Sequence, residues 1–133
     1  MTRRISNWEQ ALSDYLVSKR KDQFSYGSFD CANFVSGAVE AMTGENPMAD
    51  VGKYDSLLTS VKMLKSLGAD NLEAFIDTRF EEVPIGFAQT GDLAFYDGSV
   101  GVVVNAKAVF ATEIGYTMID RSVLTKTWGV GRG

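Results

Sequence analysis

The chain has 133 residues, of which 45% are hydrophobic and 23% charged, so its size and composition fit one globular domain, expected to span residues 1–133. Its net charge of −4, without a block of basic residues, argues against nucleic-acid binding. No apolar run approaches the ~20 residues that cross a bilayer. The first residues also lack the apolar core of a secretory signal. We therefore expect neither a membrane span nor a signal peptide.

Two residue counts limit the chemistry further. The chain contains no histidine, and it has one cysteine, Cys31. The absence of histidine excludes Ser-His-Asp and Cys-His catalytic sites as well as histidine-ligated metals. One cysteine allows neither a disulfide within the chain nor a cysteine-cluster metal site. We therefore expect no bound metal and no cofactor.

The first half of the sequence predicts helices. A helix is expected over residues 7–20, where a capping box that opens at Ser6 precedes an apolar face. That face comprises Trp8, Leu12, Tyr15 and Leu16. Asp30 is expected to cap a second helix, which begins at Cys31 and ends at Gly44.

Two more helices are expected before the pattern changes. Asp55 is the expected cap of the third, which ends at Gly68 and directs its apolar residues inward. Those residues are Leu57, Leu58, Val61, Leu64 and Leu67. A fourth, short helix is expected to start at Asp70.

In the second half the apolar spacing becomes that of strands. Strands are expected at residues 93–96 and 99–104, joined by Asp97-Gly98, a sequence typical of a type I′ hairpin turn. The Val-rich second strand predicts burial on both faces. Residues 107–112 and 116–119 predict two further strands. Three later residues are expected to close the sheet or pack across its end: Val123, Leu124 and Trp128. Helices followed by an antiparallel meander predict an α+β domain.

Cys31 is the residue that most directly indicates chemistry. At the first turn of a helix, backbone N–H groups and the helix dipole would lower the pKa of its thiol, as for the nucleophile of a cysteine protease. Asp30, directly before it, acts in the opposite sense. A lone cysteine is also most often a small buried apolar residue. Both interpretations stay open, and the apolar one is favoured because an activated nucleophile needs a base.

Three segments resemble the NlpC-type family of cell-wall peptidases, which has a papain-like fold. Residues 24–34, FSYGSFDCANF, resemble the family's loop that leads to a cysteine at the head of a helix. Residues 90–96, TGDLAFY, resemble its Gly-Asp-Leu strand. Residues 99–102, SVGV, stand where the family has His-Val-Gly-Ile.

A second resemblance covers nearly the whole chain. It is to small proteins encoded in the tail clusters of phages, prophages and gene-transfer agents. These are similar in an opening Trp-x-x-x-Leu-x-x-Tyr-Leu pattern, here Trp8–Leu16, and in Met-Thr-Gly-Glu-Asn-Pro, here Met42–Pro47. They also share Asp-Cys-Ala-x-Phe, Gly-Asp-Leu and a tryptophan near the end, here Trp128.

The resemblance to the NlpC-type family implies a papain-like α+β fold, with helices packed on an antiparallel sheet. It implies that Cys31 stands at the position of the nucleophile and Ser99 at that of the catalytic histidine. Four residues would line the cleft: Tyr26, Asp30, Asp92 and Tyr96. The family's third catalytic residue falls near Ala111, which has no polar side chain.

Carboxylates near the predicted strands are poor substitutes for the missing histidine, because a carboxylate raises the pKa of a neighbouring thiol. Asp92 is expected to cap the turn before its strand and Asp97 to serve the hairpin. Glu113 is expected to be solvated. Only the cysteine of the family's triad therefore remains.

Three hypotheses follow. The first is a structural or assembly protein of a phage tail tip or baseplate. It would dock on tail hub or tip proteins. It would be present in the bacterial host cytoplasm during assembly and then in the virion tail. Its candidate docking segments are residues 22–29, 45–54 and 129–133. The second is a cysteine peptidase acting on peptidoglycan, with a base that is not histidine or that a partner chain supplies. The third is a module that binds peptides or glycans in the retained cleft.

Overall fold

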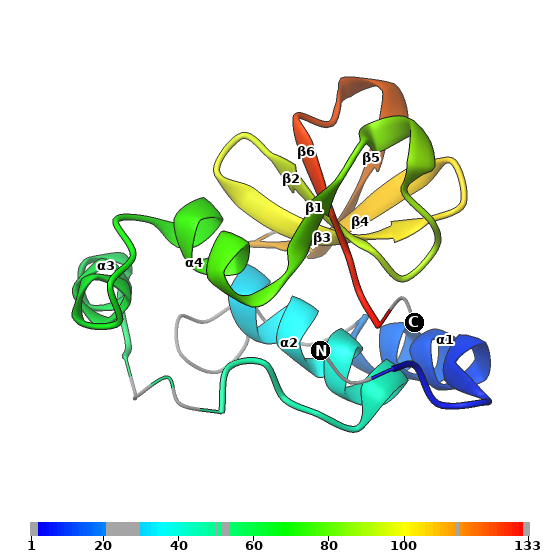
Figure 1. Ribbon diagram of the computed structural model, residues 1–133, viewed down its shortest axis with the longest axis horizontal. Coiled ribbons are helices and arrows are strands. Elements are labelled where there is room, and N and C mark those ends of the chain that lie inside the picture. The colour runs from blue at the N-terminus through cyan, green and yellow to red at the C-terminus, as the bar shows by residue number, and fades with distance from the viewer. Residues whose placement is uncertain (1–2, 21–29, 50, 52–53, 114, 132–133) are drawn as a thin grey trace.

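Helices and strands occupy successive halves of the chain in the computed structural model, which describes residues 3–20, 30–49, 51, 54–113 and 115–131 (Figure 1). Within these ranges the helices are α1 (Trp8–Lys19), α2 (Cys31–Thr43), α3 (Leu57–Ser66) and α4 (Leu72–Arg79). The strands are β1 (Glu81–Val83), β2 (Leu93–Tyr96), β3 (Ser99–Val104), β4 (Lys107–Thr112), β5 (Gly115–Asp120) and β6 (Lys126–Gly129). This arrangement confirms the α+β class.

Each pair of neighbouring strands in the sheet is antiparallel, and the strand order is β1-β6-β2-β3-β4-β5. Strands β2 to β5 form the expected meander. Asp97 and Gly98 have φ angles of 48° and 81°, which confirms the type I′ turn. β6 then returns between β1 and β2 and pairs Trp128 with Leu93. Trp128 therefore lies inside the sheet, and the sequence does not predict β1 at its edge.

Strand β3 is buried on both faces, as its Val-rich run predicts. Val100 and Val102 belong to the apolar cluster shared with the helices, whereas Val103 and Phe110 belong to a second cluster on the opposite face. A Cβ atom at Gly101 would collide with the carbonyl oxygen of Val109 and with the ring of Phe110. Glycine at this position thus allows β3 and β4 to lie close together.

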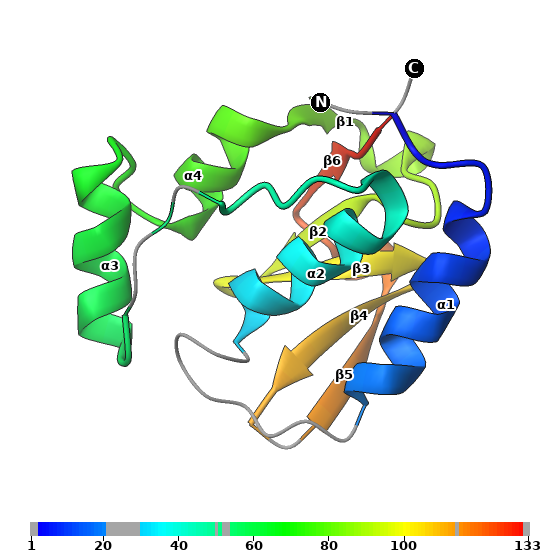
Figure 2. The same ribbon diagram turned by 90° about the horizontal axis from the view of Figure 1, so that it is seen from below.

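Helices α1 and α2 lie on one face of the sheet, with α2 packed against β3 and β4 (Figure 2). The expected apolar face of α1 is confirmed: Leu12 is 3% exposed, and Tyr15 donates a hydrogen bond to the Phe34 carbonyl of α2 at 2.8 Å. The expected capping box of α1 is wrong, because Asn7 occupies the N-cap position and makes no side-chain cap bond. Of the helices that the structure describes, none is both long and apolar enough to traverse a membrane.

Helix α3 lies at the edge of the molecule and packs against α4 (Figure 1). Its cap is Ser56 rather than Asp55, because the Ser56 hydroxyl accepts the Thr59 backbone N–H at 3.2 Å. The expectation of five inward-facing residues is also wrong. Leu57 and Leu58 are 61% and 64% exposed, and Leu64 alone of the five is buried. Helix α4 begins at Leu72, two residues later than expected, with Asn71 as its cap.

Candidate functional site

Cys31 is the first residue of α2, as expected, at the end of the helix that faces the β2–β3 hairpin (Figure 2). Asp30 caps the helix: its Oδ1 accepts the Asn33 backbone N–H at 2.8 Å. The Cys31 thiol lies against β3, where it interacts with the backbone N–H of Val100. Helix capping and the packing of α2 on β3 therefore fix the position of the sulfur.

The surroundings of Cys31 keep its thiol protonated. Burial is the largest effect and raises the pKa of the thiol, and the negative charge of Asp30 raises it further. The backbone N–H groups of Val100 and of the first turn of α2 lower it by less. The net result is a pKa above the ordinary value, so the helix terminus does not generate a reactive thiolate here.

Asp30 is also the centre of a polar network that reaches beyond α2. The Tyr54 hydroxyl donates to Asp30 Oδ2 at 2.6 Å. The side-chain amide of Asn33 donates to Asp30 Oδ1 at 3.1 Å and to the Tyr54 hydroxyl at 3.2 Å. Through these bonds the start of α2 is joined to the chain just before α3.

Tyr54 is a site residue that the sequence pattern does not indicate, because nothing in its spacing separates it from other aromatic residues. The pKa of Tyr54 is raised, mainly because its side chain is partly buried. The hydrogen bond to Asp30 and the negative charge of Asp30 raise this pKa further. The phenol stays protonated and acts as a donor. It is therefore not a base for Cys31 at neutral pH.

A cavity of about 290 Å³ opens beside Cys31, between the start of α2, helices α3 and α4, and the β2–β3 hairpin. Its described aliphatic and methionine lining is Ala32, Met48, Val51, Leu57, Val61, Met63, Leu64 and Leu72. Its described polar groups belong to Asp30, Cys31, Tyr54, Ser60, Asn71 and Ser99. The structure thus brings three of the residues singled out in the sequence, Cys31, Ser99 and Asp30, to one cavity.

The two positions expected for the rest of a triad carry no base. Ser99 opens β3 directly after the hairpin turn and lines the cavity with Cys31. Ala111, on β4, is 3% exposed within the apolar cluster under the helices. The two residues present a hydroxyl and a methyl group, and neither side chain is an imidazole.

Asp92 and Tyr96 are not among the residues that line this cavity. Asp92 is fully buried, accepts the Gln89 and Val130 backbone N–H groups at 2.7 and 3.2 Å, and pairs with Arg4 at 3.0 Å. Asp92 therefore caps the turn, as expected. Its contacts with Arg4 and Val130 also connect this turn to the first and last described segments of the chain. Tyr96 ends β2 and is 36% exposed. Tyr26 and the segment 22–29 lie outside the described residues.

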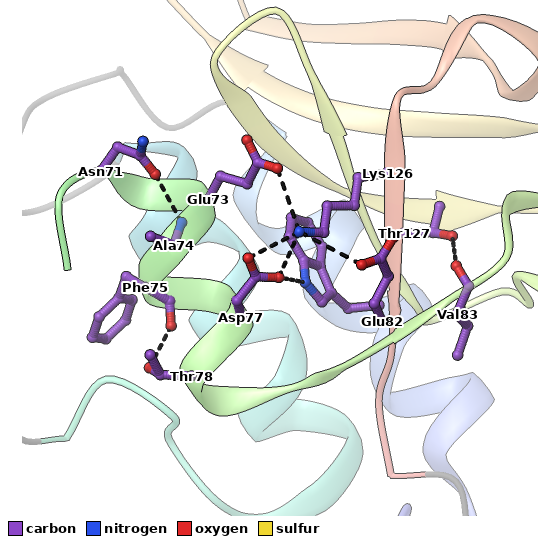
Figure 3. A network of polar contacts seen from close by, with 11 residues as sticks. Asn71, Glu73, Ala74, Phe75, Asp77, Thr78, Glu82, Val83, Lys126 and Thr127 are labelled. Carbon is purple, nitrogen blue, oxygen red and sulfur yellow. Dashed lines mark hydrogen bonds and ion pairs between the residues drawn. The ribbon is translucent and has the colours of Figure 1, made fainter.

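A second polar cluster joins α4 to the sheet (Figure 3). Lys126 Nζ on β6 lies 2.7 Å from Asp77, 3.4 Å from Glu73 and 3.7 Å from Glu82. The Trp128 indole N–H donates to Asp77 at 2.9 Å. The hydrogen bond from Lys126, followed by that from Trp128, lowers the pKa of Asp77. In the part of the chain that the structure describes, no group of three Asp, Glu, Cys or His side chains is arranged to hold a metal.

The fold and the cavity together define an α+β protein whose single cysteine heads a helix that lies against an antiparallel sheet. The chain belongs to the family described as Domain of unknown function (DUF6950), whose model matches residues 3–130. No curated protein and no solved structure matches it.

Proposed function

We propose that this protein is a non-catalytic assembly component built on a papain-like fold of the NlpC type, and that it acts in the tail tip or baseplate of a phage-like particle. A cysteine at the head of α2, packed on an antiparallel sheet that contains residues 93–96 and 99–104, supports the fold assignment. The position of Ser99 in the same cavity as Cys31 supports its correspondence to the family's histidine.

The observation that carries the non-catalytic assignment is the chemistry around Cys31. Peptide hydrolysis requires a group that takes the proton of the nucleophile and later delivers a proton to the leaving amine. The chain has no imidazole for this exchange. The raised pKa of the Cys31 thiol shows in addition that its described neighbours disfavour the thiolate.

Asp30 and Tyr54, which line the cavity together with Cys31, do not supply the missing base. Asp30 is held by the Asn33 backbone and by the Tyr54 hydroxyl, which donates to it at 2.6 Å. Its charge also opposes loss of the thiol proton. Tyr54 is committed as a donor to Asp30. The two groups are thus engaged with one another, and the protonated phenol of Tyr54 is not a base for Cys31.

The tail assignment rests on the motifs that resemble small tail-cluster proteins, from Trp8–Leu16 to Trp128. On this proposal, the protein is present in the cytoplasm of the bacterial host during assembly and then in the virion tail. Its partners are other tail proteins of the hub or tip, with peptidoglycan as a further candidate.

One observation favours a second function, a cysteine peptidase acting on cell-wall peptides. Cys31 occupies the first position of α2, where the Val100 N–H and the first helical turn would stabilise a thiolate once it formed. A base from a partner chain would then be required, because activation by the helix terminus alone leaves the leaving amine without a proton donor.

Incubation of the purified full chain with peptidoglycan and with isolated muropeptides tests the proposal. Released fragments are measured by mass spectrometry, with an active NlpC-type peptidase as the positive control and Cys31→Ala as the matched variant. We expect the wild type and the variant to give the same background. Fragment release by the wild type that disappears in Cys31→Ala would contradict the proposal and establish the peptidase.

A further inference from the structure

We infer that the cavity beside Cys31 binds an apolar side chain of a partner polypeptide, and that basic residues flank this side chain in the partner. The inference rests on the proposed function, since in an active peptidase the same space would hold substrate. It names the chemistry of the segment that an assembly partner would insert.

The lining of the cavity selects an apolar group. Eight of the described lining residues have aliphatic or methionine side chains, contributed by α2, α3, α4 and residues 48 and 51. The volume of about 290 Å³ lies at the small end of ligand pockets, which typically begin at about 300 Å³. Methionine side chains adapt their shape to an incoming group. The space therefore suits one aliphatic or aromatic side chain.

The polar groups in the wall make few demands on a ligand. Asp30, Asn33 and Tyr54 are hydrogen-bonded to one another. The Ser60 hydroxyl donates to the Leu57 carbonyl at 2.7 Å. A ligand that carried charge into the cavity would lose its hydration and meet these already bonded groups, so an uncharged apolar group is preferred.

Apolar surface continues from the cavity onto the outside of α3, which favours a polypeptide over a small molecule. Leu57 lines the cavity and is also 61% exposed, and its neighbour Leu58 is 64% exposed. A ligand enclosed by the cavity would leave Leu58 and the outer part of Leu57 in water. A partner segment that inserts one side chain would cover Leu57 and Leu58 with its remaining residues.

Carboxylates next to the cavity set the preferred charge of that segment. Asp30 lies in its wall, and exposed Asp55 and Asp97 are sequence neighbours of two lining residues, Tyr54 and Gly98. Lys53, the other sequence neighbour of Tyr54, lies outside the described residues. The described lining includes no lysine or arginine, and Lys62 and Lys65 of α3 are exposed and do not line it. Basic flanking residues in the partner would therefore be attracted and acidic ones repelled.

Two serines of α3 provide a matched pair of variants. Ser60 lines the cavity, whereas Ser66 is exposed and does not line it. Each hydroxyl donates to the carbonyl three residues earlier, at 2.7 and 2.6 Å. Ser60→Phe fills the cavity, and Ser66→Phe makes the same chemical change on the outer side of the helix. Thermal unfolding of both variants verifies that each is folded.

The binding experiment uses three fluorescein-labelled peptides and the full chain, with fluorescence anisotropy as the readout. The peptides are Lys-Lys-Phe-Leu-Lys-Lys, Glu-Glu-Phe-Leu-Glu-Glu and Lys-Lys-Ser-Ser-Lys-Lys. We expect the first to bind about tenfold more tightly than either of the others. We expect Ser60→Phe to weaken its binding about tenfold and Ser66→Phe to leave it unchanged. Because Cys31 is the only thiol, bound peptide should also slow its alkylation by N-ethylmaleimide.

Three results would overturn the inference. One is that the first peptide does not bind at all, and another is that the serine or glutamate peptide binds as tightly as the first. The third is that Ser66→Phe and Ser60→Phe weaken the binding of the first peptide equally. Self-association of the wild type that Ser60→Phe abolishes, measured by sedimentation velocity, would make a second copy the occupant and contradict it as well. Mass spectrometry of the peptide separates the two proposals. Cleavage would contradict the proposed function, whereas an intact but unbound peptide would contradict only this inference.

Discussion

At Cys31, burial and the helix terminus act on the thiol in opposite directions, and burial has the larger effect on its pKa. The folded state therefore holds the thiol proton more tightly than the unfolded chain does. This contribution to stability is complete below the unfolded pKa, near 8.5 for an ordinary thiol, and is lost as pH rises through the folded pKa.

The first prediction follows from that shift. The rate of Cys31 alkylation by iodoacetamide is measured as a function of pH and corrected for access to the thiol. We expect the pH at which this rate increases to be higher for the folded protein than for the same protein unfolded in urea. The pH dependence of the rate gives both pKa values, because this cysteine is the only thiol. A folded-state pKa at or below the unfolded one would show an activated nucleophile instead.

The second prediction concerns Ser99, which shares the cavity with Cys31. An imidazolium placed there would stabilise the thiolate, so we expect Ser99→His to lower the pKa of Cys31 and to accelerate its alkylation near neutral pH. Ser66→His, an exposed serine on α3, is the matched control. If both variants alkylate like the wild type, Ser99 does not occupy the position of the family's histidine.

Part of the site was predictable from the sequence, because its signals are local. Asp30 as a cap and Cys31 at the head of a helix follow from residue order alone. The resemblance to the NlpC-type family contributed Ser99. Tyr54 was not predictable, since its contact with Asp30 spans 24 positions and depends on how the segment before α3 folds back over α2.

At the scale of elements, α3 is the helix that departs most from expectation. Its capping box is formed by Ser56 and Thr59, while the Asp55 carboxylate accepts a hydrogen bond from the Thr59 hydroxyl at 3.3 Å and caps no backbone N–H of the helix. The third prediction is that Ser56→Ala lowers the free energy of unfolding by about 1 kcal/mol. Asp55→Ala should cause no comparable loss. Urea denaturation of both variants measures the difference, and the opposite ranking would restore Asp55 as the cap.

The fold was predictable where the signal is periodic or comes from a turn. Helices α1 and α2, the hairpin at Asp97-Gly98 and the strands around it follow from spacing and turn residues. The inward direction of α3 did not follow, because an amphipathic pattern shows which residues share a face and not whether another element covers that face. The insertion of β6 between β1 and β2 is a long-range pairing with no local signal.

At the scale of the molecule, the two ends of the described chain are tied together at one point. Arg4 donates to the Val130 carbonyl at 2.8 Å, to the Thr90 carbonyl at 2.9 Å and to Asp92 at 3.0 Å. Asp92 is fully buried and also accepts the Val130 backbone N–H. The ion pair therefore joins the segment before α1, the turn before β2 and the chain after β6.

The fourth prediction is that Arg4→Met lowers the free energy of unfolding by about 3 kcal/mol, because it removes the Arg4 charge from the fully buried Asp92 carboxylate. Lys107→Met is the control, since Lys107 and Asp120 are exposed and 3.9 Å apart. Chemical denaturation should show a large loss for the first variant and none for the second. Equal effects would mean that the Arg4 contact is not a buried link.

The central claim, an assembly role that does not use the chemistry of Cys31, is tested most directly by complementation in a host that produces the particles. With the gene deleted, tails are counted by electron microscopy after supplying the wild type, Cys31→Ala or the destabilised Arg4→Met. We predict that Cys31→Ala restores tail formation to the wild-type level, and that Arg4→Met restores less because less folded protein is present. A folded Cys31→Ala that restores no more than the deletion would contradict the account.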